Sequence, residues 1–472
     1  MSIRFGTDGW RAVISDEFTF ANVRHVTQAI ADSEPAYQTR GLVVGFDTRF
    51  LSDRYAIEVA RVLAGNGIPV FLTTADTPTP IVSHAIRHLG TAGGIMITAS
   101  HNPPRYNGIK LKMEHGGAAP PGQSRKVEAQ LNQNLRENKQ PLLADYQQAL
   151  AASQITRFDP LPAYAQHVAT LIDLDAIRQI DIGIMVDPMY GAGRGIIAYI
   201  LGPRGRFRLR EMRGEMNPGF GGIHPEPIAR YLGATMEEIR NGRWDIGLAT
   251  DGDADRIGAI TSSGEFVDPH SIFALSLRYL VEKRGWRGDV VKTVSTTQMI
   301  ETICEKYALR CFETPVGFNH ICDLMLQNDV LIGGEESGGI SIKGHIPEGD
   351  GILMGLLLLE IVAHSNQPLA HNLESLREEF GHLYYERCDF MVETCDKAEL
   401  VQLLKTEAPD ELDGIALTAI NDLDGVKYRF ADGSWVLMRP SGTEPVLRVY
   451  AEARSRERVR ALLELGHRTC AL

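Results

Sequence analysis

Short apolar runs alternate with longer helical patterns through the first three quarters of the 472-residue chain. Such alternation is typical of parallel sheets whose strands are joined by crossover helices. Three runs resemble one another, because each precedes a polar loop and then a helical pattern: residues 42–45, 182–186 and 290–294. A repeated βα unit, one in each of three domains, would give this pattern, and so would the general habit of α/β folds.

Turn signals divide this pattern into segments. A Pro-Pro-Gly sequence at 120–122 opens a polar helical stretch, and a new βα pattern begins after Pro160 and Pro162. A second turn lies at 262–264, and a strand-like run begins after Gly381. We therefore expect an α/β protein in which three mixed α/β domains precede a C-terminal α+β domain, with the divisions 1–156, 157–263, 264–380 and 381–472.

Composition limits the functional classes. The 60 acidic residues exceed the 48 basic ones, and this net charge of −12 argues against a nucleic-acid partner. The N-terminus lacks the apolar core of a signal peptide, and the most apolar run, 352–363, is too short to span a bilayer. That run predicts a buried helix, so we expect no membrane partner. Six cysteines without a CxxC pair suggest reduced thiols and a cytoplasmic protein.

The first candidate for chemistry is Ser100, which follows the apolar run 94–97 within the sequence TASHNPP. A hydroxyl at the end of a buried strand, in a loop stiffened by two prolines, suits a nucleophile. A serine needs a base or a metal to react, and His101, Lys110 and Lys112 are nearby candidates. A simple Asn/Pro turn with a capping serine is the alternative interpretation.

The second candidate is the acidic sequence DGDADR at 251–256, which also follows a strand-like run. Alternate residues of extended backbone face the same way, so the carboxylates of Asp251, Asp253 and Asp255 should converge. Close carboxylates repel unless a cation neutralises them, and oxygen ligands favour Mg²⁺ or Ca²⁺. An EF-hand does not fit, because Arg256 and Ser262 replace its glycine and glutamate. A solvated acidic turn remains the structural alternative.

Two further loops could bind a sugar phosphate. The sequence GGEESGG at 333–339 combines four glycines, which allow close approach of a ligand, with acceptors suited to sugar hydroxyls. The sequence RPSGTEP at 439–445 combines an arginine, hydroxyls and free backbone amides, which can cradle a phosphate. A glycine-rich hairpin and a Pro-Ser-Gly turn are the respective structural alternatives.

Together and in this order, the four motifs resemble those of the α-D-phosphohexomutase family, which includes phosphoglucomutases, phosphomannomutases and phosphoglucosamine mutases. The N-terminal sequence FGTDGWR at 5–11 is similar to the family's opening segment. The resemblance covers essentially the whole chain. It implies four domains around a central cleft, each contributing one loop.

The resemblance also implies a role for each motif. Ser100 matches the phosphoserine, which also ligates Mg²⁺ together with Asp251, Asp253 and Asp255. The implied sugar- and phosphate-binding residues are Glu335, Ser337, Lys292, Arg439, Ser441, Gly442 and Thr443, and further active-site positions are Arg11, His101, Lys110 and Arg256. Residues 317–319 are similar to the family's variable loop.

The implied reaction interconverts a hexose 1-phosphate and a hexose 6-phosphate through a hexose 1,6-bisphosphate, with glucose 1,6-bisphosphate as activator. The Glu335-Glu336-Ser337 pattern looks more like that of glucose-preferring members, since mannose-preferring members often have methionine in the middle. Alternatives are mannose or glucosamine specificity, a glucose 1,6-bisphosphate synthase, a phosphatase, and a phosphosugar-binding regulator without turnover. The expected partners are small sugar phosphates, and the expected assembly is a monomer or homodimer. The sequence Glu348-Gly349-Asp350 departs from the arginine that often precedes this aspartate in related members, so the role of that loop stays open.

Overall fold

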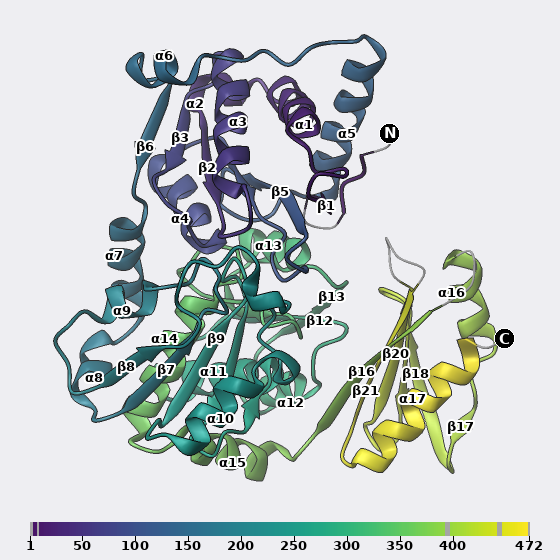
Figure 1. The fold of residues 1–472 in the computed structure, drawn as a ribbon. Helices are drawn as coiled ribbons and strands as arrows, with labels where there is room; N and C mark the ends of the chain where they lie inside the picture. Colours follow the sequence, from purple (N-terminus) through teal and green to yellow (C-terminus); the bar gives the residue numbers. More distant parts are fainter. Residues whose placement is uncertain (1–2, 7–8, 392–396, 441–445, 471–472) are drawn as a thin grey trace.

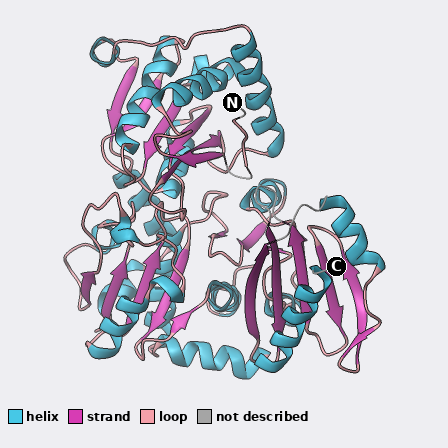
Figure 2. Cartoon of the chain, turned by 45° about the vertical axis from the view of Figure 1, so that its right-hand side comes forward, coloured by secondary structure: helices cyan, strands magenta, loops and turns pink. Residues whose placement is uncertain are grey.

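Four sheets, each flanked by helices, organise the chain (Figures 1 and 2). The computed structural model describes residues 3–6, 9–391, 397–440 and 446–470. The first sheet has the order β1-β5-β4-β2-β3-β6, in which β5 runs antiparallel to both of its neighbours, β1 and β4, and the other strands all run in one direction. Its elements are β1 (Trp10–Val13), α1 (Phe20–Ser33), α2 (Ala36–Arg40), β2 (Leu42–Phe46), α3 (Ser52–Gly65), β3 (Val70–Thr73), α4 (Thr79–Leu89), β4 (Gly93–Ile97), β5 (Tyr106–Met113), α5 (Pro121–Arg136), α6 (Tyr146–Ala151) and β6 (Ile155–Phe158).

The second sheet has the order β11-β10-β9-β7-β8. Its strands β7, β8 and β9 are parallel, β10 runs antiparallel to β9, and β11 runs antiparallel to β10. The elements are α7 (Leu161–Leu171), α8 (Leu174–Gln179), β7 (Gly183–Asp187), α9 (Ile196–Leu201), β8 (Arg208–Glu211), α10 (Gly233–Asn241), β9 (Ile246–Thr250), β10 (Ile257–Thr261) and β11 (Phe266–Val267), with 3₁₀ turns at Phe220–Gly222 and Ala229–Tyr231.

The third sheet, of order β13-β12-β14-β15, has parallel strands except for the antiparallel β15. Its elements are α11 (Pro269–Glu282), β12 (Asp289–Thr293), α12 (Met299–Lys306), β13 (Cys311–Thr314), α13 (Phe318–Gln327), β14 (Val330–Gly334), β15 (Ile340–Ile342), α14 (Gly351–Ser365) and α15 (Leu369–Phe380). The predicted buried helix is α14, in which residues 351–362 are all buried.

The fourth sheet has the order β16-β21-β20-β19-β18-β17 and is antiparallel throughout its described pairs. Its elements are β16 (Tyr384–Met391), α16 (Lys397–Thr406), β17 (Glu411–Leu412), β18 (Ile415–Asn421), β19 (Val426–Phe430), β20 (Trp435–Pro440), β21 (Val446–Ala453) and α17 (Arg456–Cys470). The predicted class, with three mixed α/β domains and a C-terminal α+β domain, is confirmed.

The central strands are apolar on both faces because helices cover both. In β2, Leu42 and Val44 join the core formed with α1 and α3, whereas Val43 packs with Val82 and Ile86 of α4. This is the arrangement expected of a buried parallel sheet, in which apolar runs are continuous rather than alternating. The candidate motifs lie in the loops at the ends of such strands.

The first two sheets extend slightly past the expected divisions. Strand β6 continues to Phe158, although the first domain was expected to end at 156. Strand β11 ends at Val267, although the second domain was expected to end at 263. We therefore propose domain divisions just after each of these strands.

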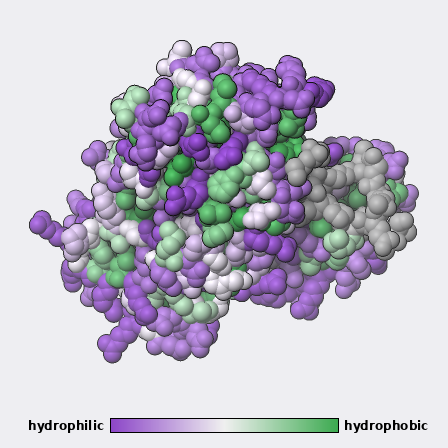
Figure 3. Space-filling model, turned by 45° about the horizontal axis from the view of Figure 1, so that its top comes forward, coloured by the Kyte–Doolittle hydropathy of each residue, from purple (hydrophilic) through white to green (hydrophobic). Residues whose placement is uncertain are grey.

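The outer face seen in Figure 3 is mostly hydrophilic, with smaller hydrophobic areas between. Among the described residues, no single helix is long and apolar enough to cross a membrane. The bent pair of α14 and α15 passes such a test only on length and composition, with an 85° bend between the two helices.

Candidate active site

Ser100 lies in the loop that follows β4, at the carboxyl end of a parallel strand, where α/β sheets commonly bind ligands. It is 1% exposed, and its φ of +51° is in the left-handed region, which is uncommon for a residue with a side chain. Its Oγ donates a hydrogen bond to Asp251 Oδ2 at 2.9 Å, and 3.2 Å separates it from His101 Nδ1. The structure therefore joins the first two predicted motifs directly.

A buried ion pair holds the Ser100 loop in this conformation. The guanidinium of Arg49, which is 2% exposed, pairs with Asp47 at 3.1 Å and donates to the carbonyls of Ser100 and Asn102 at 2.5 and 2.7 Å. Asp47 accepts from Thr98 Oγ1, which in turn accepts from the Ser100 amide at 2.8 Å. Both peptide groups of Ser100 are thus fixed. The sequence signal was a pair of charged residues directly after the strand at 42–46.

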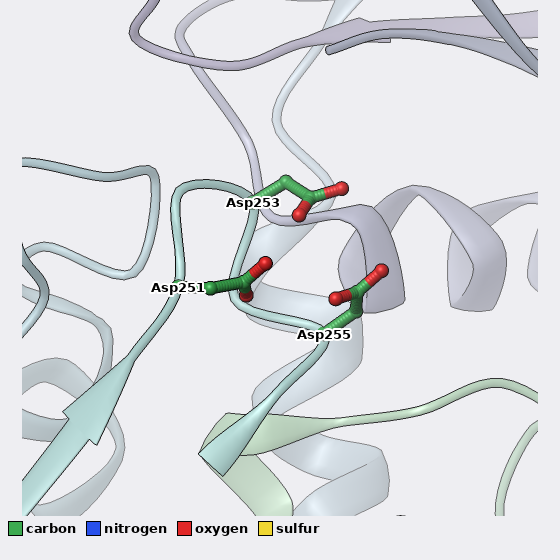
Figure 4. A group of neighbouring side chains, drawn as sticks. All are labelled: Asp251, Asp253 and Asp255. Atoms are coloured by element: carbon green, nitrogen blue, oxygen red, sulfur yellow. The ribbon is translucent and has the colours of Figure 1, made fainter. Parts of the chain in front are cut away.

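The three aspartates extend to the same side of the loop between β9 and β10 (Figure 4). One oxygen from each of Asp251, Asp253 and Asp255 lies within 4.8 Å of the others, and all three residues are buried. Gly252 allows the close approach of the two loops, because a Cβ there would lie 2.5 Å from the Ser100 carbonyl oxygen.

The electrostatics of this cluster fit a bound cation. Burial, and then Asp255 and Asp253, raises the pKa of Asp251 well above its usual value. Within the described part of the chain, nothing donates a hydrogen bond to the buried Asp253 Oδ1 or Asp255 Oδ1. Buried charged oxygens without partners are costly, and a hard divalent cation would satisfy them. The acidic triad therefore forms a site that could hold a metal.

Two groups from the first domain offset part of this negative charge. Lys110 Nζ lies 2.9 Å from Asp253 Oδ2 and 2.8 Å from Asp255 Oδ2, and it is 1% exposed. Thr79, at the start of α4, donates to Asp253 Oδ2 at 2.6 Å. Burial by itself raises the pKa of Asp253, but Lys110 and Thr79 outweigh burial and hold that pKa below its usual value. Thr79 was not identified from the sequence.

Three further predicted residues surround Ser100. Arg11 Nη1 donates to Asn102 Oδ1 at 2.7 Å, in the serine loop. The Arg256 guanidinium lies 3.9 Å from Asp255 and 3.7 Å from Glu226. The pKa of His101 falls well below its usual value because the ring is buried, and because Arg256, Arg11 and Lys110 disfavour a further positive charge. His101 is therefore a neutral imidazole beside the serine hydroxyl.

Glu335 and Ser337 lie in the turn that joins β14 to β15, and both are half-buried. Glu335 Oε1 accepts from the Gly317 amide at 3.0 Å, which links it to the segment predicted as a variable loop. Burial first, and then Glu336, raises the pKa of Glu335 to about 8, although Arg256 opposes this change. The third motif thus approaches the acidic cluster through Arg256.

Lys292 does not lie with these residues. It is 0% exposed, and its ammonium lies 3.0 Å from Glu301 and 3.5 Å from Glu313 and donates to the carbonyls of Thr296 and Thr297. These partners all belong to the third domain, and the two glutamates also pair with Arg429 and Lys427 of the fourth. We therefore propose a structural role for Lys292 instead of the substrate-facing one implied by resemblance.

Arg439 and Pro440 are the described residues of the fourth motif, and Arg439 Nε donates to Asp424 Oδ2 at 2.7 Å. The predicted phosphate-binding residues Ser441, Gly442 and Thr443 lie outside the described residues.

The loop at 344–350, which contains the sequence Glu348-Gly349-Asp350, joins the first three domains. Glu348 forms a buried ion pair with Lys112 of β5. Asp350 accepts from the backbone amides of Ile352 and Leu353 at the start of α14 and from the hydroxyl of Tyr164 in α7. The glutamate thus has a partner of opposite charge in the first domain.

Comparison with known proteins gives the family. Profiles of the phosphoglucomutase/phosphomannomutase family match the chain in order: alpha/beta/alpha domain I at residues 2–138, domain II at 162–264, domain III at 268–380 and the C-terminal domain at 397–465. Together they cover most of the chain.

Individual relatives agree with these matches. The chain is 30% identical to a phosphoglucomutase of Komagataeibacter xylinus, over 96% of this chain and 87% of that protein. It is also 30% identical to a phosphoglucomutase/phosphomannomutase of Thermococcus kodakarensis, over 98% of this chain and 97% of that protein. The crystal structure of a putative phosphomannomutase from Thermus thermophilus superposes with a TM-score of 0.84 at 35% identity, covering 99% of both chains. The chain therefore belongs to the phosphoglucomutase/phosphomannomutase family of phosphotransferase mutases.

Proposed function

We propose that this chain interconverts hexose 1-phosphate and hexose 6-phosphate, with glucose preferred, through a phosphorylated Ser100 and a hexose 1,6-bisphosphate. The observation that carries the proposal is the Ser100 hydroxyl, 2.9 Å from an aspartate of a buried acidic triad. A nucleophile at such a site suits phosphoryl transfer, which depends on positioning and on neutralised oxygens.

Mg²⁺ would be held by Asp251, Asp253 and Asp255 with an oxygen of Ser100, where it would neutralise charge on the transferred phosphoryl group. Phosphoserine carries about −1.5 to −2 charge, which three carboxylates alone would repel. Lys110 and Arg256 supply further positive charge beside the same carboxylates.

In the forward step, the bond between Ser100 Oγ and phosphorus breaks while a sugar hydroxyl oxygen bonds to phosphorus. That sugar hydroxyl loses its proton, and the leaving Ser100 Oγ gains one. The sugar is then a bisphosphate. After it turns over, the bond between the sugar oxygen and the other phosphorus breaks while Ser100 Oγ bonds to that phosphorus. Ser100 loses its hydroxyl proton, and the leaving sugar oxygen gains one. Asp251 Oδ2, which accepts from Ser100 Oγ at 2.9 Å, and His101 Nδ1, 3.2 Å from the same oxygen, are the candidate acceptors for the serine proton, whereas Lys110 is already paired with two carboxylates.

Glu335, Ser337 and Arg439 are the proposed ligand contacts. The carboxylate and hydroxyl suit sugar hydroxyls, and the guanidinium suits the phosphate that every hexose phosphate carries. A glucosamine phosphate is the main alternative substrate, because relatives that are 30% identical or slightly less include probable phosphoglucosamine mutases, for example in Methanothermobacter thermautotrophicus.

The test is kcat/KM for glucose, mannose and glucosamine 1-phosphates, with Mg²⁺ and glucose 1,6-bisphosphate present. We expect turnover of all three to stop on chelation of the metal, and glucose 1-phosphate to give the highest value. A higher value for another sugar would revise the preference. Binding without turnover of any sugar would favour a phosphosugar-binding regulator instead.

A further inference from the structure

One carboxylate, Asp424, connects the proposed phosphate-binding arginine to the third domain. It lies in the turn between β18 and β19, and its Oδ2 accepts from Arg439 Nε at 2.7 Å and from the backbone amide of Val316 at 3.0 Å. The turn is pressed against β20, because the next residue, Gly425, has φ +86° and a Cβ there would lie 2.4 Å from the Met438 carbonyl oxygen. The position of Asp424 is thus fixed by its own strand pair.

The same contact reaches the proposed sugar-binding loop. Val316 is followed by Gly317, whose amide donates to Glu335 Oε1 at 3.0 Å. Two consecutive backbone amides therefore face two carboxylates, Asp424 of the fourth domain and Glu335 of the third. A displacement of Asp424 would move Arg439 relative to Glu335.

The fourth domain has other contacts with the third. Lys427 donates to the Val294 carbonyl at 2.7 Å and pairs with Glu313 at 3.1 Å. Arg429 makes two contacts to Glu301, at 3.1 and 3.0 Å. Removing the Asp424 carboxylate should therefore leave the third and fourth domains associated and change mainly the orientation of the Arg439 guanidinium.

We propose that Asp424 is a positioning residue for substrate binding. It holds Arg439 through Nε, and among the described residues no partner is found for Nη1 or Nη2, which are the groups proposed to recognise phosphate. It also keeps this guanidinium aligned with Glu335. An arginine guanidinium has a fixed planar geometry, so fixing Nε sets the direction of the other two nitrogens. This inference rests on the proposed function, because it assumes that Arg439 binds the substrate's phosphate.

The test compares Asp424→Asn, Arg439→Ala and the double variant in steady-state kinetics with glucose 1-phosphate. We expect Asp424→Asn to raise KM about tenfold, as for loss of one charge-assisted contact, with kcat within about twofold. In the Arg439→Ala background, Asp424→Asn should raise KM little further, because its effect acts through Arg439. Asp424→Glu should restore part of the loss. The matched control is Asp422→Asn in the same turn, whose partner is the exposed Lys405 at 2.6 Å.

An unchanged KM in Asp424→Asn, or an effect that multiplies fully with that of Arg439→Ala, would overturn the proposal. Calorimetric measurement of glucose 1-phosphate binding in a Ser100→Ala background distinguishes failure of the positioning role from failure of the proposed function. If the unaltered chain has no mutase activity but Asp424→Asn still weakens binding, then only the proposed function fails. If activity is present and binding is unaffected, then the positioning role fails.

Discussion

The conformation of Ser100 depends on contacts that its own sequence neighbourhood does not provide. A φ of +51° costs free energy for any residue with a Cβ, and such strain persists only where surrounding structure imposes it. Here Arg49 binds the Ser100 carbonyl, and Thr98 binds its amide. Arg49 also donates to the carbonyls of Pro103 and Tyr106, so it fixes the whole loop.

We predict that Arg49→Lys lowers kcat by about a hundredfold with a smaller change in KM. A lysine keeps the charge but cannot bind four carbonyls and Asp47 at once, and each lost charge-assisted bond is worth about 1.5–3 kcal/mol. Steady-state kinetics and circular dichroism check the result. Arg54→Lys is the control, since that side chain is 66% exposed and should tolerate the change. Equal kcat values for the two variants would contradict a positioning role for Arg49.

At this scale, the sequence indicated the candidate reactive groups more readily than the residues that hold them in place. Ser100 and the aspartates carry distinctive chemistry at strand ends, so both motifs were predictable. The bond between Ser100 and Asp251 joins residues 151 apart, and only the fold creates it. The position of Lys292 was not predictable, because its partners Glu301 and Glu313 become visible only when the strand faces are known.

At the scale of elements, a stack of imidazoles joins α4, α7 and the 344–350 loop. His84 and His167 rings stack with centroids 4.8 Å apart, and His167 and His345 with centroids 5.1 Å apart. His167 Nε2 lies 2.9 Å from His345 Nδ1, and His345 Nε2 lies 2.9 Å from Asp350. Burial, and then the neighbouring histidines, lowers the pKa of His84 to about 3 and that of His167 to about 4.

This stack should make the fold sensitive to acid. Both histidines are neutral in the folded protein but bind protons below about pH 6.5 when the chain is unfolded. Their contribution to the free energy of unfolding is therefore complete above that pH and is lost as the pH falls towards 4. At pH 5, the protonation of His84 in the unfolded chain should lower the free energy of unfolding by roughly 2 kcal/mol. Besides the stacked rings, the facing groups are Asp350, Tyr164 and Arg87, whose Nη1 donates to the His345 carbonyl.

Thermal unfolding midpoints at pH 7 and pH 5 check this prediction. His84→Leu should reduce the difference between the two midpoints, because His84 Nδ1 is buried and has no hydrogen-bond partner among the described residues. His88→Leu, at the exposed end of the same stack, should leave the difference nearly unchanged. The same acid sensitivity in both variants and the parent would contradict the account.

The predicted strands were those buried on both faces, such as β4 and β9, whose residues are all apolar, small or buried. The short edge strands β6 and β11 were not predicted. In β6 two of four residues are exposed, and β11 has only two residues. Such segments lack a hydrophobic period of their own and become strands because the sheet offers them a partner.

For the whole molecule, the structure brings together residues from different domains that are far apart in the sequence. Lys110 of the first domain pairs with the aspartates of the second, and Lys112 pairs with Glu348 of the third. The resemblance to the family predicted this convergence, whereas periodicity alone predicted only separate sheets. The role of the 344–350 loop was not predictable, because its partners come from two other domains.

Division of labour between the third and fourth domains gives a prediction at this scale. Arg439→Ala should lower kcat/KM for all hexose phosphates by similar factors of about ten to a hundred, because each substrate presents the same phosphate group. Glu335→Gln should instead change the glucose-to-mannose ratio of kcat/KM, since the orientation of hydroxyls differs between these sugars. If Arg439→Ala shifts the preference while Glu335→Gln depresses both sugars equally, the proposed roles are reversed.

The central claim is that Ser100 carries the transferred phosphoryl group. The most direct measurement is peptide mass spectrometry after incubation with glucose 1,6-bisphosphate and Mg²⁺, followed by a chase with glucose 6-phosphate. The account predicts one phosphate on the Ser100 peptide that disappears during the chase, and neither phosphate nor turnover in a folded Ser100→Ala variant. Full turnover in Ser100→Ala, or phosphate on another residue that the chase removes, would contradict it.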